Sequence, residues 1–149
     1  METSMIRRWL FYGLLGLIVE VGWTALANIG RSPDKRWLLK GQTSLWMLPI
    51  YGLIAPLYEP ARDRLRPAPW WVRGLAYMAG FFAIEYSSGA LLRRLVGDAP
   101  WDYSHTRGNL HGLIRLDYAP AWFAAGLALE RLDTIIRPCR ALANAPAEE

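Results

Sequence analysis

Residues 9–29, WLFYGLLGLIVEVGWTALANI, decide the fold class, because these 21 residues contain a single charge, Glu20. A helix needs about 20 apolar residues to cross about 30 Å of hydrocarbon. Residues 70–92 form a second stretch of this kind, in which Arg73 and Glu85 are the charges. These two stretches predict membrane-spanning helices, and the rest of the chain is interpreted around them.

Two further apolar segments are weaker candidates for membrane spans. Residues 43–59 contain Pro49 and Pro56, and each proline removes a backbone donor and kinks a helix. Residues 117–136 begin at Asp117, and the uncharged part, 118–129, reaches residue 136 only by admitting three further charges, Glu130, Arg131 and Asp133. We therefore expect an all-α fold, an integral membrane bundle of four transmembrane helices. The second helix should be broken by proline, and an interfacial or re-entrant segment should precede the fourth.

The composition excludes several classes of protein. Of the 149 residues, 53% are hydrophobic and 20% charged, which excludes an intrinsically disordered chain. One cysteine excludes an internal disulfide and therefore a disulfide-rich secreted module. The mean hydropathy is only +0.09 because the charges collect between the apolar segments. A single transmembrane domain at 1–137 and a disordered tail at 138–149 are expected, and no internal repeat stands out.

The net charge of +4 does not indicate nucleic acid as a partner, because the basic residues are scattered around the apolar segments. Basic residues at the ends of spans are typical of contacts with anionic lipid headgroups. Tryptophans near the segment edges fit the aromatic belt of a membrane protein. The expected partner is therefore the lipid bilayer. The basic residues divide evenly between the two sets of connections, so they leave the orientation open.

Polar and small residues inside the spans are the first candidates for function, because polar groups in hydrocarbon are costly. The first span carries them as one helical stripe of residues three or four apart: Gly13, Gly16, Glu20, Thr24 and Asn28. The third span repeats the design around Glu85, Ser88 and Gly89. We expect the polar faces of these two spans to meet inside the bundle. The two glutamates either carry protons or cations, or fix the helix packing.

The richest polar cluster lies between the third and fourth spans, and its members are Trp101, Asp102, Tyr103, Ser104, His105 and Asn109. One interpretation is a metal held by Asp102, His105 and His111 together with a glutamate, although the spacing matches no metal signature. The other interpretation is an interfacial loop. A serine nucleophile with a histidine base lacks the Gly-x-Ser-x-Gly elbow. We predict neither metal nor cofactor. Ser44 and Tyr51 add polar positions in the second segment.

Four stretches resemble the putative ABC-transporter type IV family: GQTSLWMLPIYG at 41–52, IEYSSG at 84–89, PWDYS at 100–104 and DYAPAWF at 117–123. The resemblance runs from about residue 9 to residue 130. It implies a small four-span fold and, since the members are mainly bacterial, localisation in the bacterial inner (plasma) membrane. Leu48 stands where some bacterial relatives carry cysteine, so no thiol chemistry is expected there.

The family pattern, carried over by position, falls on a set of residues that includes most of the polar candidates. They are Glu20, Gly41, Pro49, Tyr51, Gly52, Glu85, Gly89, Trp101, Asp102, Tyr103, Ser104, Asn109 and Gly112.

Three functions remain open at this point. The first is a permease-like transport component in which Glu20 and Glu85 line a polar path, working as a homo-oligomer or with a partner membrane chain. The second is a small intramembrane enzyme or lipid- or metal-binding protein in which both glutamates converge with Asp102 and His105. The third is a structural or assembly protein. No phosphate-binding glycine loop is present, so the chain is not itself an ATPase subunit, and the sequence favours a non-enzymatic role.

Overall fold

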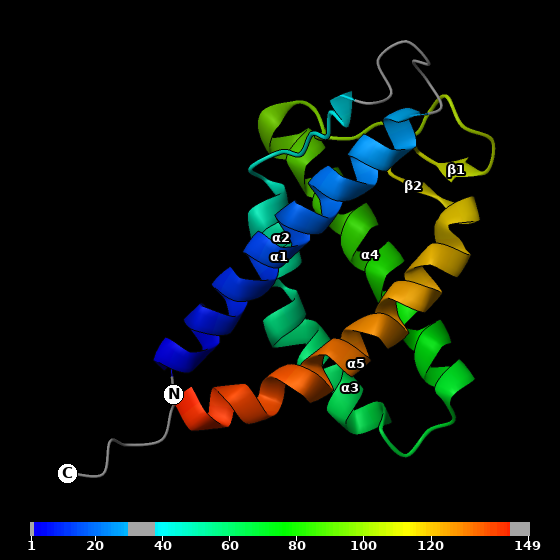
Figure 1. The fold of residues 1–149 in the computed structure, drawn as a ribbon. Coiled ribbons are helices and arrows are strands. Elements are labelled where there is room, and N and C mark those ends of the chain that lie inside the picture. Colours follow the sequence, from blue (N-terminus) through cyan, green and yellow to red (C-terminus); the bar gives the residue numbers. More distant parts are fainter. Residues whose placement is uncertain (1, 30–37, 144–149) are drawn as a thin grey trace. The chain divides into compact units, whose positions relative to one another are not determined.

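The computed structural model describes the backbone of residues 2–29 and 38–143, and the side chains of residues 4–29 and 38–135. Helices dominate it (Figure 1). In chain order the helical elements are α1 (Glu2–Ile29), α2 (Met47–Gly52), the π-helical turn η2 (Ile54–Tyr58), α3 (Glu59–Leu65), α4 (Trp70–Val96), the 3-10 turn η3 (Leu116–Tyr118) and α5 (Ala119–Ala143). The mainly helical prediction is confirmed.

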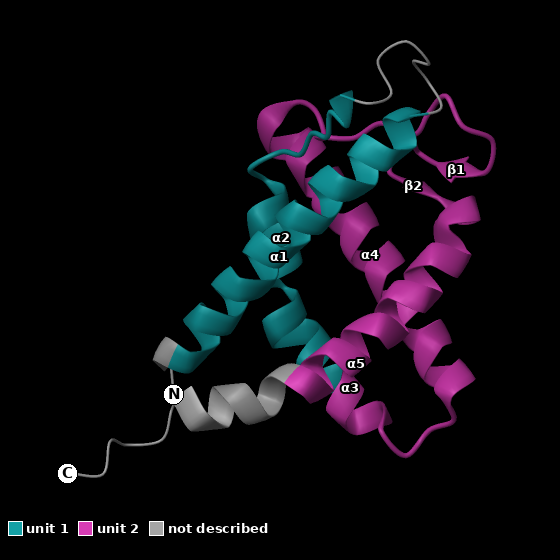
Figure 2. Ribbon diagram, in the orientation of Figure 1, with its two compact units in different colours: residues 1–61 teal, residues 62–149 magenta. Residues whose placement is uncertain are grey.

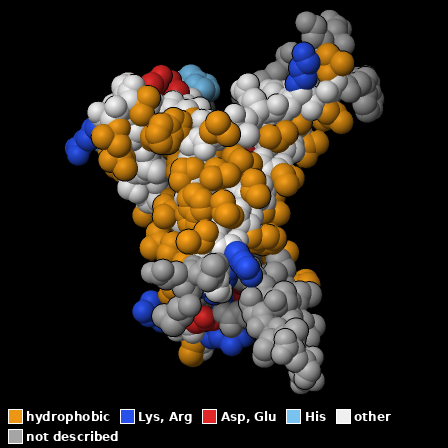
Figure 3. Space-filling view, turned by 90° about the vertical axis from the view of Figure 1, so that its left-hand side faces the viewer, with side chains coloured by type: hydrophobic (Ala, Val, Ile, Leu, Met, Phe, Trp, Pro, Cys, Tyr) orange, Lys and Arg blue, Asp and Glu red, His pale blue; other side chains and the backbone are white. Residues whose placement is uncertain are grey.

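Among the residues that the structure describes, two helices are long and apolar enough to cross a membrane, at Ser4–Ile29 in α1 and at Trp70–Val96 in α4. They contain the two strongest predicted spans. Large apolar side chains on them face outward, for example Ile18, which is 70% exposed. Figure 3 shows one face on which hydrophobic side chains gather, with few charged side chains among them. The weaker segments do not meet the same criteria, so a total of four spans stays a prediction.

Contacts divide the chain into two compact units, Met1–Ala61 and Arg62–Glu149 (Figure 2). In unit 1 the long helix α1 packs against α2 and η2, and in unit 2 the long helix α4 packs against α5. The helix α5 continues to Ala143, beyond the point at which the sequence predicted a disordered tail. The last six positions of that tail, 144–149, lie outside the described residues.

Prolines explain why the second apolar segment is not one regular helix. Pro49 lies in the first turn of α2, and Pro60 lies in the first turn of α3, where a helix does not use the missing N–H. Pro56 lies within η2 and cannot donate to the carbonyl four residues earlier. The helix widens around it into a π-helical turn, a common form of local irregularity in helices. The interruption at proline follows the prediction.

A small antiparallel sheet corrects the all-α expectation. Strand β1 (Asn109–Leu110) pairs with β2 (Ile114–Arg115). In the connecting turn His111 has a φ of 54° and Gly112 a φ of 69°, and a type I′ turn requires positive φ at two successive residues. The Gly112 N–H donates to the Asn109 side-chain oxygen at 2.8 Å and stabilises the turn. The usual Asn-Gly or Asp-Gly signal is absent here, so the sequence did not predict the hairpin.

An ion pair within unit 2 explains how α5 accommodates one of its charges. Asp133 of α5 pairs with Arg62 of α3, and these side chains are only 1% and 4% exposed. A buried charge without a partner would be strongly destabilising. The pair therefore joins α3 to α5.

Small residues of α1 allow α2 to approach closely. A Cβ atom added at Gly13 would lie 2.7 Å from the carbonyl oxygen of Leu48, and one at Gly16 would collide with the ring of Tyr51. By contrast, a Cβ atom at Gly22 of the same helix would meet nothing within 4 Å. Two of the five members of the predicted stripe, Gly13 and Gly16, thus form a surface on which α2 packs.

The close approach at Gly13 can be tested with a matched pair of alanine variants. Gly13→Ala should lower the free energy of unfolding by about 1–3 kcal/mol, because the new methyl group overpacks a backbone contact. Gly22→Ala should be neutral or should stabilise by up to about 1 kcal/mol through helix propensity. Denaturant unfolding in detergent, followed by tryptophan fluorescence, measures both. Equal effects of the two substitutions would contradict the packing described here.

Candidate functional site

Glu20 lies in the middle of α1 and is held by the segment that leads into α2. The Thr43 hydroxyl donates a hydrogen bond to the Glu20 carboxylate, and the Tyr51 phenol makes a second one. One turn further along α1, the Thr24 hydroxyl accepts a hydrogen bond from the Gln42 N–H at 2.8 Å. The polar stripe of α1 therefore binds residues 40–51 of its own unit.

Glu85 lies in the middle of α4 and is held in a similar way in unit 2. The Trp122 indole N–H of α5 donates to the Glu85 carboxylate at 3.3 Å. The Tyr103 phenol, from the segment between α4 and α5, also forms a hydrogen bond to it. Ser88, predicted to share this polar face, instead donates to the carbonyl of Ile84 in its own helix at 2.6 Å.

Two other glutamates of the described helices, Glu59 and Glu130, have cationic partners. Glu59 lies 3.3 Å from the Arg8 guanidinium and accepts a hydrogen bond from the Tyr12 phenol at 3.0 Å. Glu130 lies 2.9 Å from the Arg73 guanidinium and accepts one from the Tyr77 phenol at 3.0 Å. These are the positions Arg8, Tyr12 and Glu59 in unit 1 and Arg73, Tyr77 and Glu130 in unit 2. We call each such trio a clamp.

Glu20 and Glu85 differ from these acids in the nature of their partners. Within residues 4–29 and 38–135, no ion pair involves either carboxylate. Their hydrogen-bond donors are the neutral side chains of threonine, tyrosine and tryptophan. An ionised carboxylate in apolar surroundings is costly without a cation. These two positions are therefore suited to accept a proton or a cation.

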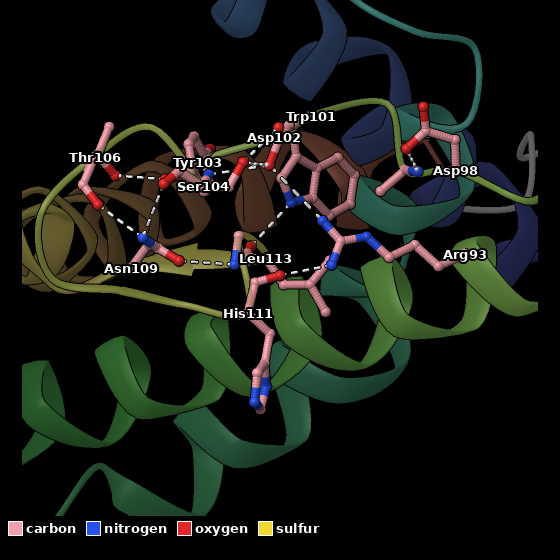
Figure 4. A network of polar contacts seen from close by, with 12 residues as sticks. Arg93, Asp98, Trp101, Asp102, Tyr103, Ser104, Thr106, Asn109, His111 and Leu113 are labelled. Carbon is pink, nitrogen blue, oxygen red and sulfur yellow. Dashed lines mark hydrogen bonds and ion pairs between the residues drawn. The ribbon is translucent and has the colours of Figure 1, made fainter.

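The segment between α4 and α5 folds into a loop fixed by side-chain hydrogen bonds (Figure 4). The Asn109 amide donates to the Thr106 carbonyl at 2.7 Å, and the Trp101 indole N–H donates to the Leu113 carbonyl at 2.9 Å. The Trp101 ring lies against Gly89 of α4, where an added Cβ atom would be 3.0 Å away. Trp101 and Asn109 thus have structural partners.

Asp102 closes the first turn of this loop. Its carboxylate accepts hydrogen bonds from the N–H and the hydroxyl of Ser104, at 3.0 and 2.7 Å, and lies 3.8 Å from the Arg93 guanidinium. The hydrogen bonds from Ser104 hold the pKa of the Asp102 carboxyl below its usual value, and Arg93 adds to this effect. Because Asp102 is also 56% exposed, its contacts are those of a loop turn at the surface.

Tyr103 connects the loop to Glu85, and aromatic and cationic neighbours hold its ring. The rings of Tyr103 and Tyr118 meet edge to face, with centroids 5.9 Å apart. The Arg115 guanidinium lies 4.2 Å from the Tyr118 ring centroid. Asp117 pairs with that guanidinium and raises the pKa of Arg115. The donor to Glu85 is therefore anchored outside the helix that carries the carboxylate.

The two histidines do not form a metal site with the carboxylates. His105 is exposed, and the ring of His111 lies 2.8 Å from the Tyr86 phenol. Across the part of the chain that the structure describes, no group of three or more His, Cys, Asp or Glu side chains could hold a metal ion.

The predicted site residues fall into two groups. Glu20, Tyr51 and Ser44 belong to unit 1, where the Ser44 hydroxyl accepts a hydrogen bond from the Trp46 N–H at 3.3 Å. The others belong to unit 2 and are Glu85, Ser88, Trp101, Asp102, Tyr103, Ser104, His105 and Asn109. The expected meeting of Glu20 with Glu85 concerns both units and stays a prediction.

Sequence reasoning missed several partners of these residues. Thr43 and Trp122 carry neutral donors to the two glutamates, and neither was singled out. The clamps were also missed, although a signal for them exists. In both units the arginine of the clamp is followed four residues later by its tyrosine. Eight residues after the tyrosine comes Glu20 in unit 1 or Glu85 in unit 2. Residues four apart lie on the same face of a helix.

One family model matches the chain over residues 8–143, and its description is putative ABC-transporter type IV. The match covers nearly the whole sequence, including most of α1, all of α4 and both clamps. No solved structure matches the chain.

The role of Ser104 in the loop can be tested by pH titration. Since the folded pKa of Asp102 is lowered, its stabilising effect is present above the ordinary aspartate pKa of about 4 and is lost as the pH falls through the folded value. Ser104→Ala should shift the titration of Asp102 upward, toward about 4, and weaken this acid destabilisation. Carboxyl carbon NMR of the labelled protein measures the shift.

Ser87→Ala is the matched control, because the described hydrogen bond of the Ser87 hydroxyl lies within α4, to the Ile84 carbonyl. The titration of Asp102 should be the same in this variant as in the wild-type protein. An unchanged Asp102 titration in Ser104→Ala would show that the loop turn does not depend on this hydrogen bond.

Proposed function

This chain belongs to the putative ABC-transporter type IV family, and we propose that it is a multi-pass, permease-like component of a membrane transport system. One observation carries the proposal. Glu20 and Glu85 lie in the middle of the two helices of membrane-spanning length, and their described partners are neutral donors. Intramembrane ionisable residues commonly mark ion or substrate pathways.

The chemistry of the two carboxylates supports a role in moving protons or cations. A carboxylate that is ion-paired within the protein already has its neutralising charge, as Glu59 and Glu130 do. A carboxylate whose described partners are hydroxyl and indole donors still requires a neutralising charge in a low dielectric. A proton or a cation arriving at Glu20 or Glu85 supplies that charge, and its departure restores the acceptor.

We propose that the broken second segment and α5 complete four spans in a single transmembrane domain. The pieces from α2 to α3, Met47–Leu65, have a helical length of about 28 Å at 1.5 Å per residue, close to the thickness of the hydrocarbon layer. In α5, pairing with Arg73 compensates Glu130, and pairing with Arg62 compensates Asp133. These pairs support the placement of an otherwise charged helix in the membrane.

Four spans are few for alternating access, so we propose that the chain acts as a homo-oligomer or with a partner membrane chain. The bacterial inner membrane is the proposed location. The lipid-facing surface would be provided by the outward apolar side chains of α1 and α4, such as Ile18 and Leu95. Energy would come from an ion gradient or from a separate ATPase chain, because the sequence has no phosphate-binding glycine loop.

The contacts of Asp102 favour transport over an intramembrane enzyme. An enzyme built on Glu85 and Asp102 requires their side chains to converge. The described hydrogen bonds of Asp102 come from Ser104, and its ion pair is with Arg93, whereas Glu85 is bound by Tyr103 and Trp122. The two carboxylates therefore have separate sets of partners.

The proposal is tested by flux through the purified protein in liposomes, with a pH-sensitive dye inside and K⁺ or Na⁺ gradients imposed outside. Glu20→Gln and Glu85→Gln keep the hydrogen-bonding shape and remove the charge. Each should reduce proton or cation flux by roughly tenfold or more, a change of about 1.4 kcal/mol in barrier.

Asp98→Asn is the matched control, since Asp98 is exposed and its carboxylate bonds the N–H of the next residue. It should keep the flux of the wild-type protein. Full flux in both glutamine variants would overturn the transport role, and lost thermal stability with unchanged flux per folded molecule would indicate a structural role for the glutamates.

A further inference from the structure

The two units share a spacing of chemically similar residues. The arginine, tyrosine and glutamate of the long helix stand at 8, 12 and 20 in the first unit and at 73, 77 and 85 in the second. A glycine, a proline, an aromatic residue and a glutamate then follow, at 41, 49, 51 and 59 in the first case and at 112, 120, 122 and 130 in the second. The offset is 65 residues in the long helix and 71 in the following segment, so the second connection is six residues longer.

Equivalent residues make equivalent contacts. In unit 1 Glu59 accepts the Tyr12 phenol and pairs with Arg8. In unit 2 the residues at the same positions, Glu130, Tyr77 and Arg73, form the same trio. Both clamps join the first part of the long helix to a later helix, which is α3 for Glu59 and α5 for Glu130. A shared spacing alone could arise by chance, but a shared spacing with the same bonding partners indicates a common structural plan.

The contacts around Glu20 and Glu85, which have no ion pair among the described residues, are repeated as well. Tyr51 bonds Glu20 and lies against Gly16, one turn earlier in α1. At the equivalent positions of unit 2, Trp122 bonds Glu85. The Trp122 ring also lies 5.4 Å from the ring of Phe81, which is the equivalent of Gly16. In each unit the aromatic residue two positions after the proline, Tyr51 or Trp122, supplies one of the hydrogen-bond donors to Glu20 or Glu85.

One packing contact is repeated with the sizes of its members exchanged. In unit 1 the large residue Trp9 of α1 lies against Gly52 of α2, where an added Cβ atom would be 2.5 Å from the indole. In unit 2 the small residue is on the long helix, where Gly74 lies against the ring of Phe123 in α5. The pairs 9–52 and 74–123 are equivalent, because positions 9 and 74 differ by the helix offset of 65 and positions 52 and 123 by the later offset of 71. Each contact keeps one large and one small member.

The pattern of matching positions explains why no internal repeat stands out in the sequence. The matching positions are few and widely spaced, and several carry different residues, such as Tyr51 and Trp122 or Trp9 and Gly74. A proline at 56 also breaks the second helix of the first copy, whereas α5 is continuous. The repeat becomes visible only when contacts are compared.

We infer that the chain consists of two copies of one helical hairpin, residues 8–61 and 73–132, and that Glu20 and Glu85 are equivalent sites that each bind one proton. The duplication stands on the repeated contacts. The use of these sites in transport rests on the proposed function. It adds to that proposal the ligand, a proton, and the stoichiometry, two protons per chain.

The groups facing each site are chemically alike. Glu20 is faced by Thr43 and by the titratable Tyr51. Glu85 is faced by Trp122 and by the titratable Tyr103. In the second site the Arg115 guanidinium lies 5.9 Å from the ring centroid of Tyr103, the tyrosine that bonds Glu85. Both carboxylates are therefore expected to bind a proton in place of an internal counter-ion.

Dicyclohexylcarbodiimide tests the two proton sites, because this apolar reagent adds to a protonated carboxyl group and rearranges to a stable N-acylurea. The full chain is treated in detergent or liposomes over a range of pH and the products are located by peptide mass spectrometry. Glu20 and Glu85 should both be modified, at rates within about tenfold of each other, the equivalent of one pKa unit. Both rates should fall as the pH rises.

The ion-paired Glu59 and Glu130 are internal controls and should stay unmodified under the same conditions. Glu20→Gln and Glu85→Gln should each remove one adduct and leave the rate at the other site. Modification of only one site, rates that differ by far more than tenfold, no modification, or equal modification of the clamps would overturn the inference. Two equivalent adducts with no change of flux in the glutamine variants would instead overturn only the transport role.

A size exchange tests the duplication without reference to protons. Gly52→Phe alone should abolish most of the folded protein, because the new ring meets the Trp9 indole. The double variant Trp9→Gly with Gly52→Phe copies the arrangement of Gly74 and Phe123, and should recover most of the folded fraction and thermal midpoint of the wild-type protein. A double variant no more stable than the worse single variant would contradict the equivalence of the two contacts.

Discussion

A charged side chain on a helix that packs in apolar surroundings must have a partner, and this constraint organises the chain. Each unit meets it with an arginine and a tyrosine on the long helix that hold a glutamate of the following segment. The same contact that compensates the charge also fixes the register between the two segments, because the tyrosine and the arginine lie one turn apart. Close packing then follows at the glycines beside the clamps, such as Gly52 and Gly126.

Against that background, the two glutamates in the middle of α1 and α4 are distinctive because their donors are neutral. Their hydrogen-bond donors come from segments outside the long helices, and in unit 2 one donor, Tyr103, belongs to a loop held by its own hydrogen bonds. Glu85 is therefore bonded directly to the Tyr103 loop and to α5.

The sequence predicted the parts of this structure that depend on local pattern. Length and apolarity identified α1 and α4, proline positions identified the interrupted segment, and helical spacing identified the Gly13–Asn28 stripe. It did not predict which segment would cover that stripe, because Thr43 and Gln42 gave no local sign of pairing with α1. The hairpin at Asn109 was also missed, since a histidine at positive φ is uncommon. Long-range partners such as Arg62 and Asp133 require the tertiary structure.

The exchanged contact of Trp9 with Gly52 and of Gly74 with Phe123 bears on how such a chain diverges. Each contact joins one large and one small residue, so it constrains the sum of the two volumes more directly than either volume alone. We therefore expect selection to act on the pair. A larger side chain at one position is tolerated when the side chain at the other position becomes smaller. Among relatives, positions 9 and 52 should co-vary in size while each looks variable when taken alone. Correlated changes at two positions can therefore preserve evidence of a duplication after the individual residues have diverged.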